Sequence, residues 1–163
     1  VTFLNVGRHD ERQKKLTRII YAAEQLKKDN KKFRIIFIGD GPDTNFYKEE
    51  VKNKKLEHEI VFLGRKKNPY PYYKLCDCVV LSSDYEGYPV VYLESFILNK
   101  PIITTNVSDS EQIEGQGIVV EKDETEIYKA MKDFIEKGYQ ITKQFDAKDY
   151  NNNIFNKLQE IIS

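Results

Sequence analysis

The first 42 residues, VTFLNVGRHDERQKKLTRIIYAAEQLKKDNKKFRIIFIGDGP (1–42), contain two apolar runs of strand length on either side of a helical pattern. The runs at 1–6 and 33–38 are continuous rather than alternating, as in strands that are covered by helices on both faces. Between them, apolar side chains spaced roughly 3.6 residues apart predict an amphipathic helix over 13–29. A strand, a helix and a second strand in this order predict a parallel β-α-β unit.

The same alternation continues along the rest of the chain. Further strands are predicted at 60–63, 78–82, 101–105 and 117–120. Further helices are predicted at 43–56, 90–98, 124–137 and 149–162. Since no linker, repeat or low-complexity segment interrupts this pattern, the sequence predicts one α/β domain. We expect a Rossmann-like, doubly wound parallel sheet of about six strands.

The composition is that of an ordinary globular domain. The chain has 163 residues, of which 40% are hydrophobic and 12% aromatic, which argues against disorder. The 26 basic and 26 acidic side chains cancel, so we expect no nucleic-acid partner that is bound through bulk charge. No run of about 18 apolar residues occurs, so no transmembrane segment is expected. Cys76 and Cys78 are predicted to be buried and unpaired on one side of a strand, which suits a reducing cytoplasm.

The charges are unevenly divided between the two halves of the chain. Residues 1–83 carry 18 basic and 11 acidic side chains, whereas residues 84–163 carry 8 basic and 15 acidic ones. Two such halves can simply attract each other within one domain. Alternatively, the first half forms a basic rim that gathers an anionic ligand.

Glycine and charged residues are dense in the segments that follow the predicted strands, where ligands bind in open α/β sheets. Gly7 and Arg8 follow the first strand, and Lys14 and Lys15 come next. An arginine and a lysine at one strand end can neutralise a diphosphate, although a solvated basic turn is the alternative. GDGP at 39–42 lacks the spacing of a dinucleotide fingerprint or a P-loop, which favours a structural turn over a ligand cradle.

The segment SDYEGYPVVYLES (83–95) combines features of a phosphate site and a ribose site. Gly87 lets the backbone approach a ligand, and a helix that begins near Pro89 offers free amides to a phosphate. Glu94 lies about one turn inside this helix, where its carboxylate can accept hydrogen bonds from both hydroxyls of a ribose. Glu86 precedes the helix. Spacing alone leaves open that these are an exposed helix acid and a turn acid.

Residues 86–108, EGYPVVYLESFILNKPIITTNVS, resemble the E-x7-E motif and the following strand of GT4-type retaining glycosyltransferases with the GT-B fold. The resemblance extends in order through GR…K at 3–14, GDGP at 39–42, FLG at 62–64 and YKLCDCVVLSSDYEG at 73–87. It covers the C-terminal, donor-binding half of such enzymes. The resemblance therefore implies that residues 1–163 form a single nucleotide-sugar-binding domain, one half of a GT-B fold, and that the N-terminal acceptor domain of the same protein is absent.

The resemblance also implies roles for individual residues. Arg8 and Lys14, beside Gly7, would hold the donor diphosphate and stabilise the leaving nucleotide. Glu94 would bind the ribose, and Glu86 would contact the transferred sugar, so that Arg8, Lys14 and Glu86 form the catalytic set. The residues whose backbone would face the sugar or the phosphate are Gly87, Tyr88, Val90 and Val91.

By the same resemblance, Arg65 in the loop after FLG would flank the base. The sequence departs from the family pattern at three places. The first loop has Lys14-Lys15 where the family usually has Lys-Gly, and one extra residue precedes this pair. Either lysine could therefore take the phosphate role. Pro89 replaces a second glycine and removes an amide donor. Residues 107–108 are Val-Ser where the family has Gly-Gly.

The implied function is transfer of a sugar, with retention of configuration, from a nucleotide diphosphate sugar of unknown base to a growing polysaccharide or a glycolipid. No D-x-D triplet occurs, and Arg8 and Lys14 supply the charge, so no metal ion and no other cofactor is expected. The isolated domain should be nearly inactive, because the acceptor pocket would lie on the absent domain.

Two other functions remain open at this stage, a non-catalytic nucleotide-sugar-binding module and a related GT-B enzyme such as a nucleotide-sugar epimerase. We expect a cytoplasmic protein. The full protein could also attach peripherally to the inner face of the membrane.

Overall fold

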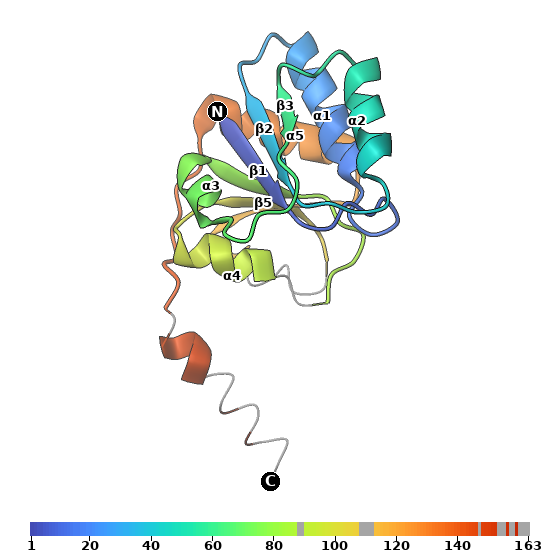
Figure 1. The fold of residues 1–163 in the computed structure, drawn as a ribbon. Coiled ribbons are helices and arrows are strands. Elements are labelled where there is room, and N and C mark those ends of the chain that lie inside the picture. The colour runs from blue at the N-terminus through green and yellow to red at the C-terminus, as the bar shows by residue number, and fades with distance from the viewer. Residues whose placement is uncertain (88–89, 108–112, 147, 153–155, 157–158, 160–163) are drawn as a thin grey trace.

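The computed structural model describes residues 1–87, 90–107, 113–146, 148–152, 156 and 159. Within them, six parallel strands form one sheet in the order β3-β2-β1-β4-β5-β6 (Figure 1). The strands are β1 (Thr2–Val6), β2 (Arg34–Ile38), β3 (Ile60–Phe62), β4 (Cys78–Leu81), β5 (Ile102–Thr105) and β6 (Gly117–Val120). This is the strand order of the dinucleotide-binding Rossmann fold, so the predicted Rossmann-like sheet is confirmed.

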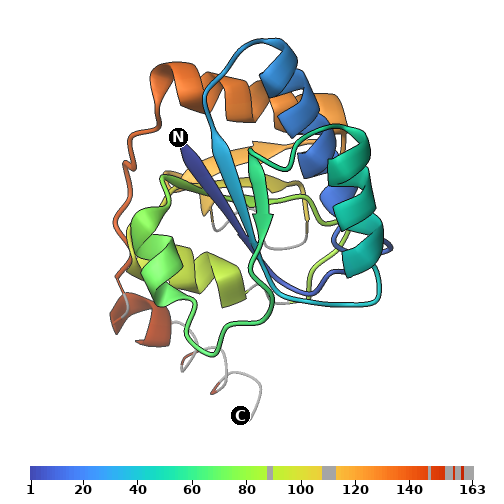
Figure 2. The ribbon, with the colours of Figure 1, turned by 45° about the horizontal axis from the view of Figure 1, so that its top comes forward.

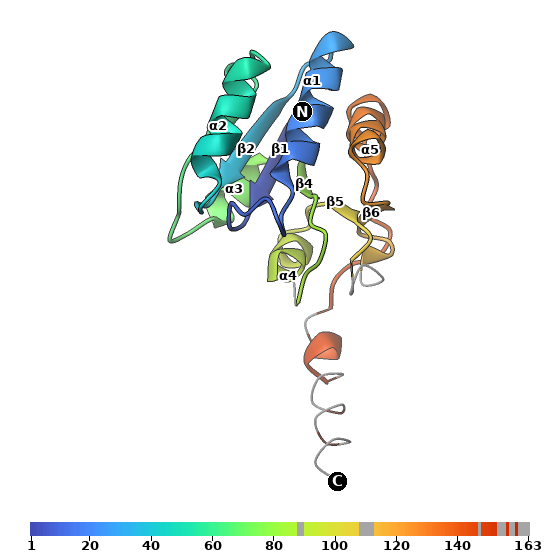
Figure 3. The ribbon, with the colours of Figure 1, turned by 90° about the vertical axis from the view of Figure 1, so that its right-hand side faces the viewer.

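Helices cover both faces of the sheet (Figures 1 and 3). One face carries α1 (Leu16–Lys28), α2 (Thr44–Asn53) and α5 (Glu124–Lys137), and the other carries α3 (Tyr70–Leu75) and α4 (Val90–Ile97). Four of these helices were predicted. α3 was not, because only one of its six residues, Tyr73, is buried, and no apolar stripe marks it in the sequence. Of the helix predicted at 149–162, residues up to 152 are helical and most of the remainder lies outside the described residues.

The four central strands, β1, β2, β4 and β5, contribute alternate side chains to two cores, which explains their continuous apolar sequences. Phe3 and Val80 pack on the face of α1, α2 and α5. Leu4 packs on the face of α3 and α4. Both cysteines are buried and unpaired, as predicted, but they lie in different cores. The prediction that both thiols lie on one side of a strand is wrong, because Cys76 ends α3 and only Cys78 belongs to β4.

The direction of chain winding reverses between β1 and β4. From β1 the chain passes through α1 to β2 and through α2 to β3, and it then returns to place β4 on the other side of β1. The loops after β1 and β2 leave the sheet at the same edge (Figure 2). Ligands bind at such a switch point in open α/β sheets. None of the described helices is long and apolar enough to cross a membrane.

Candidate functional site

The loops after β1 and β2 are packed against each other through their backbones. The His9 amide donates to the Asp40 carbonyl at 3.2 Å, and the Asp43 amide donates to the His9 carbonyl at 3.2 Å. Gly39 has a φ of 143°, and a Cβ atom on it would lie 1.7 Å from the carbonyl oxygen of Gly7. GDGP therefore forms a tight turn in which only glycine fits at position 39.

The same turn also forms the wall of a pocket of about 780 Å³ at the carboxyl ends of β1 and β2. Gly7 and Arg8 line it from the loop after β1, and Arg65 and Lys66 line it from the loop after β3. The structure thus brings together three residues that were predicted to bind the donor, Gly7, Arg8 and Arg65. The volume lies in the range of small-molecule sites, and the three cationic side chains suit an anionic ligand.

Asp40 also lines this pocket, but its carboxylate is engaged locally. It accepts hydrogen bonds from the Thr44 hydroxyl at 2.7 Å and from the Gly41 amide at 2.8 Å. These two bonds, followed by the charge of Arg65, hold the pKa of Asp40 below its usual value. Asp40 therefore stays ionised at neutral pH and stabilises the turn, and the cations still outnumber the acid in the described lining.

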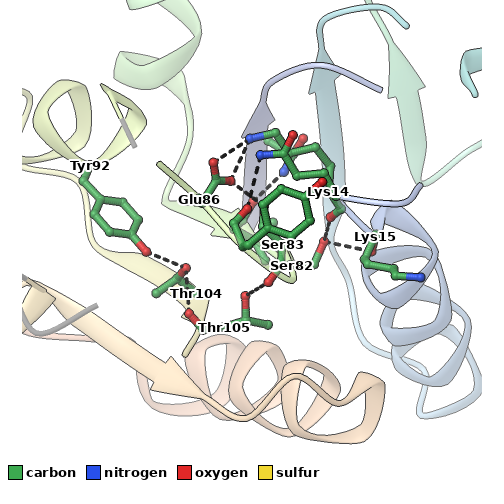
Figure 4. Close-up of polar contacts among 12 residues, drawn as sticks. Lys14, Lys15, Ser82, Ser83, Glu86, Tyr92, Thr104 and Thr105 are labelled. Carbon is green, nitrogen blue, oxygen red and sulfur yellow. Dashed lines mark hydrogen bonds and ion pairs between the residues drawn. The ribbon is translucent and has the colours of Figure 1, made fainter. Parts of the chain in front are cut away.

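Lys14 and Glu86 meet across the switch point between β1 and β4 (Figure 4). Lys14 Nζ lies 2.7 Å from Glu86 Oε1 and 2.8 Å from Oε2. The Ser83 hydroxyl also donates to Glu86 Oε1, at 2.5 Å. The Glu86 side chain is only 8% exposed and that of Lys14 is 20% exposed. Two residues of the predicted catalytic set are therefore in direct contact, and the two opposite charges compensate each other.

The structure distinguishes the two adjacent lysines. Lys15 has φ 50° and ψ 46°, the left-handed conformation that favours glycine. Its ammonium group points away from Glu86 and lies 4.0 Å from Asp84 (Figure 4). Lys14 is therefore the lysine that reaches Glu86.

Arg18 and Asp84 fix the loop after β4 and were not identified from the sequence. Arg18 donates to the Ser82 carbonyl at 2.9 Å and pairs with Asp84 at 2.6 Å. The Ser82 hydroxyl in turn donates to the carbonyls of Lys14 and Lys15 at 2.8 and 2.9 Å. The sequence held one signal for this contact, the excess of positive charge in the first half and of negative charge in the second.

Both explanations of that charge division are supported. The two halves attract each other through ion pairs, which are Lys14–Glu86, Lys15–Asp84, Arg18–Asp84, Lys31–Glu136 and Lys132–Asp29, the last with the signs reversed. The first half also forms a basic rim, since Arg8, Arg65 and Lys66 line the pocket.

Glu94 lies on α4 and contacts α3. It accepts a hydrogen bond from the Tyr73 hydroxyl at 2.6 Å. Burial and the bond to Glu94 raise the pKa of Tyr73 far above its usual value, so the tyrosine is the donor. Tyr73 was missed in the sequence because α3 was missed.

The remaining predicted site residues lie at or near the start of α4. Among the described residues, nothing lies within 4 Å of a Cβ atom built on Gly87, Val90 is 58% exposed and Val91 is half-buried. Tyr88 and Pro89 lie outside the described residues, as do Ser108 and the four residues after it. Lys14, Glu86 and Glu94 are not among the residues that line the 780 Å³ pocket.

Residues 1–152 match the family of glycosyl transferases, group 1. The chain belongs to this family. The O-antigen biosynthesis glycosyltransferase WbnH of Escherichia coli is 31% identical over 152 residues, which are 91% of this chain and 38% of that protein. Other curated relatives are matched over 25% to 37% of their lengths.

Solved structures of glycosyltransferases share the fold, including those of WaaB and HepE. The lipopolysaccharide outer core galactosyltransferase WaaB, in its apo form, superposes with a TM-score of 0.81 at 20% identity, over 96% of this chain and 49% of that one. Anabaena HepE in complex with UDP superposes with a TM-score of 0.79 at 18% identity, over 98% of this chain and 48% of that one. The chain thus has the fold of one half of a GT-B glycosyltransferase.

Proposed function

We propose that this domain binds the nucleotide diphosphate sugar donor of a longer glycosyltransferase, which transfers the sugar with retention of configuration. The observation that carries the proposal is the Lys14–Glu86 pair, which lies at the switch point beside a pocket lined by Arg8 and Arg65. A diphosphate can replace Glu86 as the partner of Lys14, because both are anions with several acceptor oxygens. Membership of the group 1 glycosyl transferases favours transfer over epimerisation.

In this proposal, different residues bind different parts of the donor. The base enters the pocket between GDGP and Arg65, Glu94 binds the ribose, and Arg8 and Lys14 bind the diphosphate. Glu86, released from Lys14, then contacts the sugar. The charges of Arg8 and Lys14 stabilise the nucleotide diphosphate as the glycosidic bond breaks. Because two protein cations supply this charge, we propose that transfer needs no metal ion.

The proposal extends to the longer protein. HepE was solved with UDP, which makes UDP the first nucleotide to test. WbnH is an O-antigen biosynthesis enzyme, which supports a polysaccharide or glycolipid acceptor. We place the acceptor site on a second domain N-terminal to this one, in a protein of the cytoplasm or of the inner membrane face. The isolated domain should then bind the donor without appreciable turnover.

Nucleotide binding tests this proposal directly. Thermal unfolding is measured with UDP, GDP, ADP and CMP, each in the presence of Mg²⁺ and in the presence of EDTA. A nucleotide present at about 100 times its Kd stabilises a domain of this size by roughly 2.7 kcal/mol, or several degrees in Tm. We expect UDP to give the largest shift. No shift with any nucleotide, or a shift that EDTA abolishes, would contradict the proposal.

The variant Arg8→Ala examines the diphosphate role. It should weaken UDP binding by about tenfold or more, because a charged hydrogen-bond partner is lost, and leave uridine binding unchanged. Arg34→Ala is the matched control, since Arg34 is an exposed arginine at the opposite, amino end of β2. Equal losses of UDP and uridine affinity in Arg8→Ala would refute the role of Arg8. Retention is tested in the full-length enzyme from the anomeric configuration of its product.

A further inference from the structure

Tyr73 and Glu94 are joined by a short hydrogen bond between α3 and α4, which lie on the same face of the sheet (Figure 1). Tyr73 Oη donates to Glu94 Oε2 at 2.6 Å. The tyrosine side chain is fully buried, whereas Glu94 is half-buried. The bond therefore ties a carboxylate near the surface to a group fixed in the core. Its length is typical of a hydroxyl that donates to an ionised acceptor.

The bond occupies one oxygen of the carboxylate. The tyrosine has a single hydrogen to donate, and a carboxylate has about four acceptor positions on two oxygens. Within the described part of the chain, the side-chain hydrogen bond of Glu94 involves Oε2. The Tyr73 bond thus sets the orientation of the carboxylate and leaves Oε1 to accept from a ligand.

Tyr73 is itself held firmly. Lys100, which follows α4, donates from Nζ to the carbonyls of Lys74 at 3.1 Å and Cys76 at 2.8 Å. These bonds tie the end of α3 to the end of α4. The Tyr73 ring packs in the core that also contains Phe96 of α4. The donor hydroxyl is therefore fixed relative to the helix that carries Glu94.

We propose that Tyr73 is a positioning residue for nucleotide binding, which holds the Glu94 carboxylate ready for the ribose hydroxyls and so sets the preference for ribonucleotides. The inference rests on the proposed ribose role of Glu94. A carboxylate on a flexible side chain must be ordered when it binds a ligand, and a residue that orders it in advance removes this cost. The cost falls only on contacts made by Glu94, so Tyr73 affects ribose recognition and leaves recognition of the base unchanged.

The test is the ratio of dissociation constants for deoxy analogues and for UDP, measured by titration calorimetry on the protein and on Tyr73→Phe. The analogues are 2′-deoxy-UDP and 3′-deoxy-UDP. We expect the wild-type protein to prefer UDP to at least one analogue by about tenfold or more, as for a hydrogen bond to a charged group. In Tyr73→Phe this preference should fall at least about threefold, and the affinity for the same analogue should stay within about twofold. An unchanged preference, or equal losses of UDP and analogue affinity, would overturn the proposal.

Two controls separate this proposal from the one on which it rests. Tyr72→Phe removes the neighbouring hydroxyl on α3, which makes no described bond to Glu94, and should leave the preference unchanged. Glu94→Gln should remove the preference, and Tyr73→Phe should have no further effect on it in that background. If Glu94→Gln removes the preference and Tyr73→Phe does not, only the positioning role of Tyr73 is wrong. If Glu94→Gln keeps the preference, the ribose role of Glu94 is wrong as well.

Discussion

The junction between the loops after β1 and β2 differs in construction from the junction between the loops after β1 and β4. The first is made largely of backbone contacts, with His9 and Asp40 paired by their main chains and Gly39 pressed against Gly7. The second contains a backbone bond from the Asp84 amide to the Gln13 carbonyl at 2.9 Å, but it is made largely of side-chain contacts, chiefly the Lys14–Glu86 ion pair. A ligand can replace a side-chain partner but cannot replace a backbone contact. The first junction is therefore the more rigid of the two, and in our proposal the second is the contact that a donor opens.

Gly39→Ala should have the largest effect, because it breaks the backbone junction. The new Cβ would lie 1.7 Å from the Gly7 carbonyl oxygen, at a φ of 143° that alanine rarely adopts. We expect a loss of more than about 3 kcal/mol in the free energy of unfolding, measured by urea denaturation. Gly64→Ala is the control, since Gly64 also has a positive φ, of 68°, but no described atom lies within 4 Å of its Cβ position. It should cost only about 1 kcal/mol. Similar losses of stability in the two variants would show that the close approach of Gly39 to the Gly7 carbonyl does not affect stability.

Acidification should weaken the same junction through His9. The imidazole is fully buried; Nδ1 is bonded to the Thr44 hydroxyl at 2.9 Å, and Nε2 has no partner among the described residues. Burial lowers the pKa of His9, and the charge of Asp40 opposes this only in part. The neutral form is therefore favoured in the fold. Its stabilising effect is present above the unfolded pKa of about 6.5 and is lost as the pH falls through the folded value.

The measurement is the free energy of unfolding from pH 7.5 to pH 5 for the wild-type protein and for His9→Phe. One proton taken up on unfolding changes this energy by at most about 1.4 kcal/mol per pH unit. We expect a smaller decrease on acidification in His9→Phe. Thr44 keeps its bonds to Asp40 and Gly41 in this variant, so no hydroxyl is left without a partner. Identical pH profiles would show that His9 does not titrate on unfolding.

Lys15→Gly should change stability the least. It tests whether Lys15 contributes to the β1–β4 junction through its side chain or only strains its backbone. Lys15 is in the left-handed region, which costs a non-glycine residue about 1 kcal/mol. Glycine removes this strain but adds entropy to the unfolded chain, so we expect stabilisation of about 0.5 kcal/mol in thermal unfolding. Lys15→Ala retains the strain and should not be stabilised. Destabilisation by glycine would show that the Lys15 side chain contributes more than its backbone costs.

The strands could be predicted from their continuous apolar runs, and the long helices could be predicted from apolar side chains spaced about 3.6 residues apart. Which of Lys14 and Lys15 reaches Glu86 could not be predicted, because the two side chains are chemically identical and only the backbone angles of Lys15 distinguish them. The Tyr73–Glu94 bond joins residues 21 positions apart on different helices, and one of these helices has a single buried residue. Gly7, Arg8 and Arg65 could be predicted to lie on one side of the sheet because each follows a predicted parallel strand, and the family resemblance added the place of Arg65 beside the base.

The affinities of Lys14→Ala and Lys15→Ala for UDP and uridine test most directly the claim that the β1–β4 junction opens to receive a diphosphate. The two variants remove the same side chain at adjacent positions. We predict that Lys14→Ala weakens UDP binding by about tenfold or more, that Lys15→Ala changes it by less than about twofold, and that neither changes uridine binding, as measured by titration calorimetry. Equal losses of UDP affinity in the two variants, or none in Lys14→Ala, would contradict the claim.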